Sequence, residues 1–283
     1  MPASYTAYIP VFNQALVLGS TLAGLREQSV PPAEIFVVDD GSTDGSGDLA
    51  AAAGATVLRQ PGNLGRGAAR ARALTEARHE FVLCADAGKR IAADFAARGL
   101  EHFARQERLA AVHGRVGQPP ARTLAHRWRG RHLFLARPGP VEPCTTHNSG
   151  AAMVRRAAVR QIGNYNAALR AHEDDDLGRR LVAAGWEIWY DPAMLAECLM
   201  QNNLPEVFAR YARWFEPRDR GWSWRDYPHN LRTALRVMAP LDWAQRDWPA
   251  LLATLALPHY LLWRAGAAPA TELKHPTPPL HAP

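Results

Sequence analysis

Short apolar runs alternate with helical patterns through the first 106 residues, and this alternation constrains the fold more than any other feature of the chain. Strand-like runs occupy 5–12, 35–38, 56–58 and 81–85, and helical patterns occupy 14–28, 44–53, 65–78 and 93–106. Strands and helices that alternate at this spacing form right-handed βαβ units on parallel strands. We therefore predict an α/β fold with a Rossmann-like, mainly parallel sheet flanked by helices.

The pattern changes after residue 138, where three prolines mark a loop. The predicted elements beyond it are a strand at 150–154, helices at 156–162 and 173–184, and a strand at 186–190 that Asp191-Pro192 ends. From residue 204 the chain has a helical, Trp-rich pattern. We predict one α/β domain over 1–203, a helical C-terminal appendage over 204–268 and a Pro-rich, disordered tail over 269–283.

Composition and sequence ends indicate a cytoplasmic, globular protein. Hydrophobic residues make up 47% of the 283, which is enough to fill a sizeable core. The three cysteines lack CxxC spacing, so neither a disulfide framework nor a zinc site is expected. The N-terminus has no signal-peptide pattern. The longest apolar stretch, 248–263, is too short and too interrupted to span a bilayer and fits better in a membrane interface.

The charge balance favours anionic partners. The net charge is +6 and the sequence pI about 9.6, which suits nucleotide diphosphates or phospholipid headgroups. Arginines gather between Arg122 and Arg137, a pattern equally consistent with a binding surface and with a solvated basic loop. No nucleic-acid-reading module accompanies them, so nucleic acid is not an expected partner.

Polar side chains stand where three of the predicted strands end. Asn13 follows the first strand, Asp39 and Asp40 the second, and Asp86 the fourth. Ligands of open α/β sheets bind beyond these ends, so we expect the three ends to converge on one crevice. A carboxylate there can accept a hydrogen bond from the ring N–H of uracil or from ribose hydroxyls. The alternative is that Asp39 or Asp40 only forms a turn.

Four consecutive acids, Glu173 to Asp176, open the helix predicted at 173–184. Interaction with the positive end of a helix stabilises an exposed carboxylate by about 0.3–1 kcal/mol and does not require four of them. Crowded carboxylates raise one another's pKa, which makes one of them a competent general base near neutral pH. The run therefore predicts a catalytic carboxylate.

Six segments occur in a characteristic order: IPVFNQ, VVDDGSTDGS, NLGRGAARARA, the strand end at Asp86, EDDDLGRRLVAAGW and RYARW. As a set, over roughly residues 5 to 215, they resemble the family 2 glycosyltransferases of GT-A fold. The resemblance implies a nucleotide-sugar donor, often uridine-linked, and inverting transfer of the sugar to an acceptor hydroxyl. We expect such a chain to act in cell-envelope or exopolysaccharide glycan synthesis.

The resemblance also implies which residues bind the donor. Asp40 would contact the base, with Asp39 nearer the ribose. The other implied donor contacts are Pro10, Asn13, Asn63, Gly65, Arg66, Asp86, Arg210, Arg213 and Trp214. The alternative for the last three is an ordinary amphipathic helix with Trp in the core. Ala71 stands where the family commonly has Asn, which leaves Arg70 open to being an ordinary surface arginine.

On the acceptor side, Asp174 matches the family's general base. Glu173 would orient the acceptor, Asp176 would support the start of the helix beside it, and His147 is a further candidate acceptor contact. Replacing the base with Asn is expected to abolish transfer and preserve donor binding.

The segment Asp86-Ala87-Gly88 aligns with the family's Asp-x-Asp motif, whose carboxylates hold Mg²⁺ or Mn²⁺ against the donor diphosphate. Gly88 replaces the second carboxylate, so Asp86 alone would hold the divalent cation together with phosphate and water oxygens. We expect Lys89 and Arg90, helped by the cluster between Arg122 and Arg137, to replace the metal in part.

The expected partners are a nucleotide-sugar donor and a glycan or lipid-linked acceptor. The Trp- and Arg-rich C-terminal region predicts peripheral contact with the inner face of the cell membrane. The principal alternative function is a non-catalytic nucleotide-sugar-binding protein that has lost its metal site. A nucleotidyltransferase is less consistent with the sequence, because no Gly-rich, Lys-containing loop follows the first strand.

Overall fold

The computed structural model describes residues 4–117, 121–134, 139–217 and 221–267. These residues form two compact units. The first consists of the described residues of Met1–Pro120 and Phe134–Gln201, and the second of those of Ala121–Leu133 and Asn202–Pro283. The expected tail at 269–283 lies outside the described residues.

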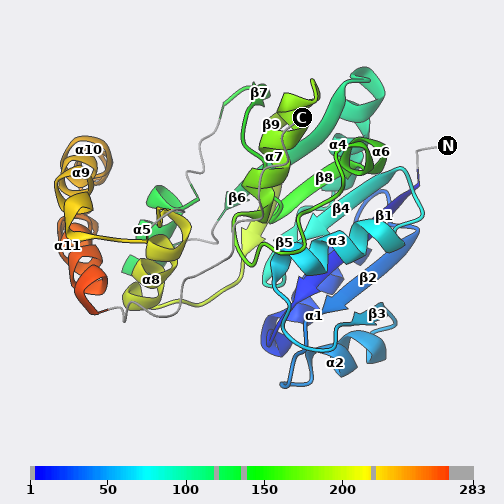
Figure 1. Cartoon of the computed structure of the whole chain (residues 1–283), viewed down its shortest axis with the longest axis horizontal. Coiled ribbons are helices and arrows are strands. Elements are labelled where there is room, and N and C mark those ends of the chain that lie inside the picture. The colour runs from blue at the N-terminus through cyan, green and yellow to red at the C-terminus, as the bar shows by residue number, and fades with distance from the viewer. Residues whose placement is uncertain (1–3, 118–120, 135–138, 218–220, 268–283) are drawn as a thin grey trace, which may run out of the picture. The chain divides into compact units, whose positions relative to one another are not determined.

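The N-terminal half of the first unit is a parallel α/β layer (Figure 1). Its strands, in the order β3-β2-β1-β4, are β1 (Tyr5–Val11), β2 (Glu34–Asp39), β3 (Thr56–Arg59) and β4 (Phe81–Ala85). The connecting helices are α1 (Ala15–Arg26), α2 (Ser46–Ala52) and α3 (Arg66–Glu76). All three neighbouring strand pairs are parallel, as the alternation in the sequence predicted.

The other half of the sheet is mixed rather than mainly parallel. Its strands are β5 (Lys89–Ile91), β6 (Leu109–Gly117), β7 (Glu142–Cys144), β8 (Ala151–Arg155) and β9 (Glu187–Cys198). The helices that accompany them are α4 (Phe95–Arg105), α6 (Arg156–Gln161) and α7 (Glu173–Ala183). Strand β8 runs antiparallel between β4 and β6, whereas β6 and β9 are parallel. No strand was predicted at β6, where Ala, Gly and His weaken the β pattern.

Strand β9 continues through Asp191-Pro192, where the sequence predicted that it ends. The register with β6 shifts at this point, so that Gly114 pairs with Asp191 but Arg115 pairs with Leu195. The Asp191 carboxylate accepts a hydrogen bond from the N–H of Ala193 (2.8 Å). The bulge accommodates the proline, which has no N–H to donate, and the strand resumes beyond it.

Two apolar clusters fill the space between the sheet and the helices on its two faces. Side chains of β1 alternate between them: Tyr5, Ala7 and Ile9 belong to one cluster and Tyr8 to the other. A central strand buried on both faces is apolar throughout, which explains the continuous runs in the sequence. All three cysteines are free thiols.

The second unit is helical. It comprises α5 (Leu124–His132), α8 (Leu204–Trp214), a 3₁₀ turn (Trp224–Asp226), α9 (Tyr227–Thr233), a π-helical turn (Ala234–Met238), α10 (Ala239–Ala244) and α11 (Trp248–Ala267). Among the described residues no helix is both long enough and apolar enough to cross a bilayer.

Helix α5 is not a solvated basic loop, and it belongs to the second unit although it lies within the span 1–203 of the predicted α/β domain. It packs in the second unit, with Trp128 completely buried and its indole N–H donating to Thr254 of α11 (2.9 Å). Arg127 pairs with Asp247 (2.7 Å), and Arg131 contacts both Asp242 and Asp247. These two carboxylates compensate the basic charge of α5, although they lie far from this helix in the sequence.

Candidate functional site

Three strand ends meet at one edge of the sheet, as the sequence predicted. Strands β2, β1 and β4 are parallel neighbours, so Asp39, the loop after Val11 and Asp86 lie at the same edge. Asn13 joins the first two ends, because its side-chain oxygen accepts from the N–H of Thr43 (2.8 Å). Pro10 lies within β1, half-buried beside this edge.

The two aspartates at the end of β2, Asp39 and Asp40, are bound differently. Both carboxylate oxygens of Asp40 are occupied by the protein: Oδ1 accepts from Gln60 and the N–H of Leu64, and Oδ2 from the N–H of Gly65 (2.9 Å). Asp39 Oδ1 accepts from the N–H of Ser42 (2.9 Å), and no contact to Oδ2 is seen among the described hydrogen bonds. Asp40 therefore holds the loop before α3, and its expected contact with a base stays a prediction.

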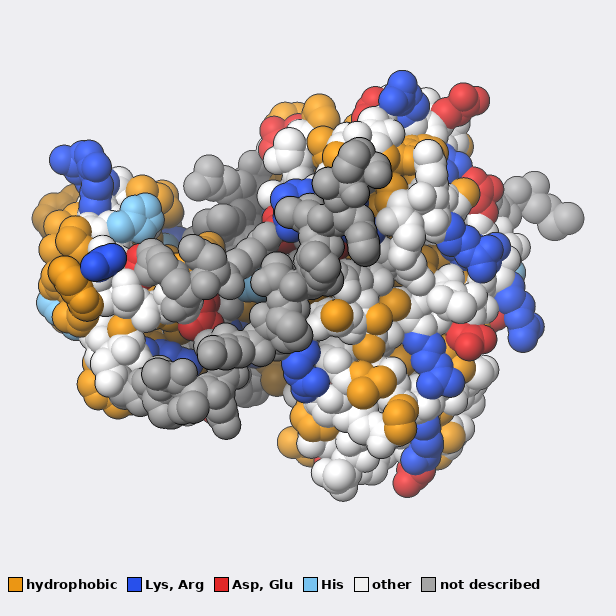
Figure 2. Space-filling model, in the orientation of Figure 1, with side chains coloured by type: hydrophobic (Ala, Val, Ile, Leu, Met, Phe, Trp, Pro, Cys, Tyr) orange, Lys and Arg blue, Asp and Glu red, His pale blue; other side chains and the backbone are white. Residues whose placement is uncertain are grey.

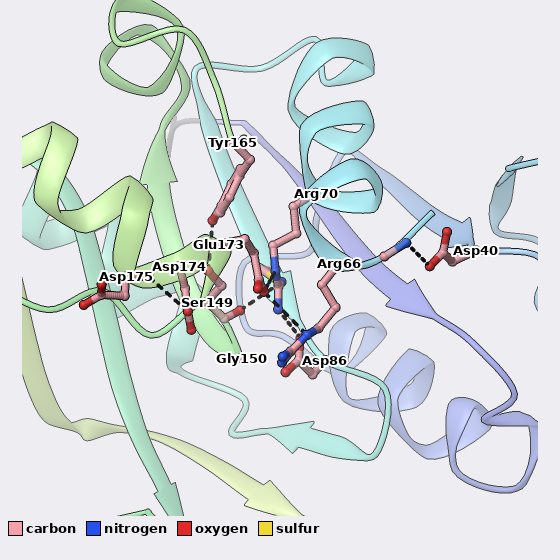
Figure 3. A network of polar contacts seen from close by, with 12 residues as sticks. Asp40, Arg66, Arg70, Asp86, Ser149, Gly150, Tyr165, Glu173, Asp174 and Asp175 are labelled. Carbon is pink, nitrogen blue, oxygen red and sulfur yellow. Dashed lines mark hydrogen bonds and ion pairs between the residues drawn. The ribbon is translucent and has the colours of Figure 1, made fainter. Parts of the chain in front are cut away.

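The loop before α3 is also fixed from the other side. Arg170 donates to the carbonyl oxygen of Asn63 (2.9 Å) and contacts its side-chain oxygen. Arg66, the first residue of α3, is exposed and reaches toward Asp86 (Figure 3). Of the residues expected in this loop to bind the donor, Arg66 presents the most accessible charge, while the side chain of Asn63 is engaged by Arg170.

Arg70 is the centre of a buried ionic network and not a surface arginine (Figure 3). Its Nε lies 3.0 Å from Glu173 Oε1, and one terminal nitrogen lies 2.8 Å from Asp86 Oδ1. The side chains of Arg70 and Glu173 are each 1% exposed. The network joins α3, the end of β4 and the start of α7.

The sequence contained a signal for the burial of Arg70. The buried residues of α3 include Ala69, Ala73 and Leu74. Arg70 precedes Ala73 by three residues and Leu74 by four, so it lies on the apolar face of this helix. A charged side chain on such a face needs a compensating partner, which here is supplied by residues far along the chain. Only the fold identifies Glu173 and Asp86 as these partners.

The acids that open α7 differ in their surroundings. Burial, followed by the charge of Glu173, raises the pKa of Asp174 above its ordinary value, although Arg70 and Arg66 act in the opposite direction. Asp175 and Asp176 instead pair with Arg179 and Arg180 on the same helix. Figure 3 shows Asp175 directed away from the network. Asp174 is thus the acid whose environment suits a proton acceptor.

His147 lies beneath α7 and is only 4% exposed. Its Nε2 is 3.3 Å from the hydroxyl of Tyr165, which also lies 3.0 Å from Ser149 Oγ. Burial lowers the pKa of His147 to about 3, with further contributions from His113 and Arg70, so its imidazole is neutral at physiological pH. His147 packs against Gly178 in the middle of α7, and the structure does not present its imidazole at an open surface as expected for an acceptor contact.

Two hollows lie outside this network. One, of about 420 Å³, is lined by residues 163–167 together with Asp176 and Arg180. The other, of about 550 Å³, lies between α4 and β9, where His102 is 2.8 Å from the buried carboxylate of Asp191. The larger hollow is not lined by any residue of the carboxylate and arginine network, so volume alone does not locate the chemistry here.

A profile described as Glycosyl transferase family 2 matches residues 6–163, more than half of the 283-residue chain. The chain belongs to this family. The matched span contains the three strand ends and Arg70, whereas α7 with Glu173 and Asp174 follows it.

Two curated relatives are glycosyltransferases by name. Pre-mycofactocin glycosyltransferases from two strains of Mycobacterium tuberculosis, CDC 1551 / Oshkosh and ATCC 25618 / H37Rv, are 29% identical over 221 residues. The alignment covers 73% of this chain and 45% of theirs. The chain therefore spans less than half the length of these relatives.

Solved glycosyltransferases share the fold. The mannosyltransferase PcManGT from Pyrobaculum calidifontis, in complex with GDP-Man and Mn²⁺, aligns with a TM-score of 0.56 at 18% identity, covering 94% of this chain and 74% of that one. TarS 1-349 from S. aureus, in complex with UDP-GlcNAc, aligns with a TM-score of 0.57 at 15% identity, covering 93% and 83%. These likenesses confirm the GT-A fold predicted from the sequence.

In this family 2 chain the metal ligands implied by the resemblance are incomplete. Within the described part of the chain no group of three His, Cys, Asp or Glu side chains is arranged to hold a metal ion. Asp86 faces Arg70 on one oxygen and Lys89 on the other (3.5 Å). Arg90, expected to assist, instead pairs with Glu27 at the surface (2.7 Å). The donor atoms present do not fit a divalent cation.

Three expected donor contacts of the family 2 chain belong to the other unit. Arg210, Arg213 and Trp214 lie on α8, and Trp214 is 37% exposed rather than in a core. An Asn203–Glu206 capping box fixes the start of this helix. Their role at the donor stays a prediction.

Proposed function

We propose that this chain transfers a sugar from a nucleotide-diphosphate donor to an acceptor hydroxyl with inversion of the anomeric configuration. The observation that carries the proposal is that one site contains two kinds of group. One is Asp174, whose pKa is raised, and the other is the set of cations around Asp86, at the edge where β1, β2 and β4 end. One group suits a proton acceptor, and the other suits a diphosphate.

In the proposed reaction Asp174 accepts the proton of the acceptor hydroxyl. The hydroxyl oxygen attacks the anomeric carbon from the face opposite the diphosphate, and the bond from that carbon to the diphosphate oxygen breaks with its electron pair. A single displacement of this kind converts an α-linked donor into a β-linked product. Glu173, held by Arg70, contributes by raising the pKa of Asp174.

For the donor, we propose a uridine-linked sugar. Asp39 is the better candidate for the contact with the base, since the oxygens of Asp40 are already used by the protein. PcManGT and TarS are in complex with GDP-Man and UDP-GlcNAc respectively, which supports a nucleotide-sugar donor in general. The expectation that Arg210 and Arg213, three residues apart on α8, bind a diphosphate and that Trp214 contacts a sugar stays a prediction from the resemblance.

For the acceptor, we propose a glycan or lipid-linked saccharide of the cell envelope, reached at the inner surface of the membrane. The support is an apolar surface on the second unit, here called the Trp surface, whose exposed members include Trp243, Trp248, Leu252 and Trp263. Figure 2 shows orange side chains gathered over this helical unit with basic side chains beside them. Tryptophan next to arginine is typical of helices that lie in a membrane interface.

The experiment that tests the proposal is a mass-spectrometric screen of nucleotide sugars for binding and for slow hydrolysis, with and without Mn²⁺. We expect one donor class to bind and to lose its sugar to water over time. Binding without hydrolysis or transfer would favour the non-catalytic binding protein instead, and failure to bind any donor would contradict both.

A further inference from the structure

The carboxylate of Asp86 is already neutralised by side chains of this chain. Arg70 lies 2.8 Å from Oδ1, and the Lys89 ammonium lies 3.5 Å from Oδ2. Burial alone would raise the pKa of Asp86, but the charges of Arg70, Lys89 and Arg66 outweigh it and hold the pKa well below the ordinary value. A divalent cation at Asp86 would have to displace these cations.

Position 88 leaves little room for a second carboxylate. Gly88 has φ of +84°, and its N–H donates to Thr21 Oγ1 (2.9 Å). A Cβ at this position would lie 2.8 Å from Met200 Sδ and 3.3 Å from Val17 Cγ2. An Asp side chain here would therefore require both a left-handed backbone and displacement of Met200.

Lys89 is held in place and is not a loose surface lysine. Its side chain is 13% exposed, and its N–H bonds to the carbonyl oxygen of Asp86 (3.1 Å). A Cβ on Gly150 would come within 1.8 Å of Lys89 Nζ, so the ammonium occupies space that a side chain at position 150 would take. Gly150 is fixed in turn by the Asn148 side chain, which accepts from its N–H (3.0 Å).

The charges around Asp86 correspond to those of a metal site. Two carboxylates with a divalent cation have no net charge, and Asp86 with Lys89 likewise has none. Arg70 and Glu173 compensate each other in the buried part of the network. The exposed guanidinium of Arg66, 3.8 Å from Glu173, adds a second cation on the accessible side.

We propose that Lys89, with Arg66, binds the donor diphosphate in the place of a divalent cation, so that transfer by this chain requires no metal. The inference rests on the proposed function. When the bond to the anomeric carbon breaks, the diphosphate oxygen keeps the electron pair, and the Lys89 ammonium stabilises the added negative charge without giving up its proton. Arg90, exposed and paired with Glu27, takes no part.

The test measures binding of UDP and GDP by calorimetry, together with donor hydrolysis, for the full chain in excess EDTA and in Mn²⁺. We expect one of the two diphosphates to bind, with dissociation constants within about two-fold in the two conditions. Lys89→Met should weaken that binding about ten-fold or more in EDTA, because an ion-paired contact is lost. Arg90→Met, the neighbouring control, should bind as the wild type does.

Loss of wild-type binding and hydrolysis in EDTA, restored by Mn²⁺, would overturn the inference while leaving the proposed function in place. So would a Lys89→Met variant that binds like Arg90→Met. The comparison of the two variants is valid only if both unfold at the same midpoint as the wild type. The wild-type measurements in EDTA and in Mn²⁺ test the inference without any variant. A wild-type chain that neither binds a diphosphate nor hydrolyses a donor in either condition would overturn the proposed function and this inference with it.

Discussion

At the residue scale, Asp174 differs from the three acids beside it, because each of those is paired with an arginine. Glu173 is bound to Arg70, and Asp175 and Asp176 are bound to arginines one turn further along α7. The only hydrogen bond seen at the Asp174 carboxylate among the described contacts comes from the N–H of Asp175 (3.0 Å). Asp174 is partly buried and has no ion pair among the described contacts, so it keeps a raised pKa, which is the property a general base requires.

The first prediction concerns the pH dependence of catalysis. Asp174 must be deprotonated to accept a proton, so kcat/KM falls as the pH drops through its pKa. Arg66 lowers that pKa, and Arg66→Ala should therefore raise it and move the acid limb of the profile to higher pH. The control is Arg72→Ala, a half-buried arginine of the same helix that donates to the carbonyl oxygen of Arg59. An unchanged limb, or one moved to lower pH, would argue against Asp174 as the base.

Arg70 acts at the element scale, because it connects α3, β4 and α7 through one side chain. We predict that Arg70→Met destabilises the first unit by about 3–5 kcal/mol, since it leaves the Glu173 carboxylate buried without a partner. Urea unfolding measures this, with Arg72→Met at the half-buried arginine of the same helix as the control, expected within about 0.5 kcal/mol of the wild type. A loss below about 1 kcal/mol for Arg70→Met would mean that the network contributes little to folding.

The sequence predicts those elements whose pattern is local. The four strands of the parallel half are short apolar runs followed by turn residues, and the acids Glu173 to Asp176 mark the start of α7. Helix α5 was not predicted, because two of its arginines and one of its histidines are paired with Asp242 and Asp247, more than a hundred residues away. Local patterns contain no information about such distant partners.

The same limit applies to the candidate site. The strand-end aspartates and Asp174 could be predicted from their motifs and their positions in the sequence. Other features of the site depend on contacts between distant segments. These features are the burial of Arg70, the hydrogen bonds that the protein makes to Asp40, and the position of Lys89 rather than Arg90 beside Asp86. Lys89 and Arg90 are adjacent on β5, and successive residues of a strand point to opposite faces, so only the sheet decides which one faces the site.

At the scale of the whole molecule, the chain combines a GT-A unit with a helical unit that includes α5. The Trp surface belongs to the second unit alone. Its tryptophans Trp243 and Trp263 are 63% and 66% exposed, which is unusual for such large apolar side chains. The fold of this unit does not depend on burial of these two side chains, so they are available to contact a membrane.

We therefore predict that the chain co-sediments with vesicles that contain anionic phospholipid, and that high salt weakens the binding. The double variant Trp243→Ser/Trp263→Ser should bind about ten-fold more weakly, because apolar area is lost from the contact. Leu16→Ser, which removes a fully exposed apolar side chain from the first unit, is the control and should bind normally. A wild-type chain that stays in the supernatant would contradict the membrane proposal without affecting the transfer reaction.

The most direct test of the account compares Asp174→Asn with Asp175→Asn, using the donor identified by the nucleotide-sugar screen. We predict that Asp174→Asn lowers the rate of transfer by about 10²–10⁴-fold and leaves donor affinity unchanged, because only proton removal is lost. Asp175→Asn, one residue away and directed out of the network, should remain close to wild type. An Asp174→Asn variant as active as Asp175→Asn would contradict the account.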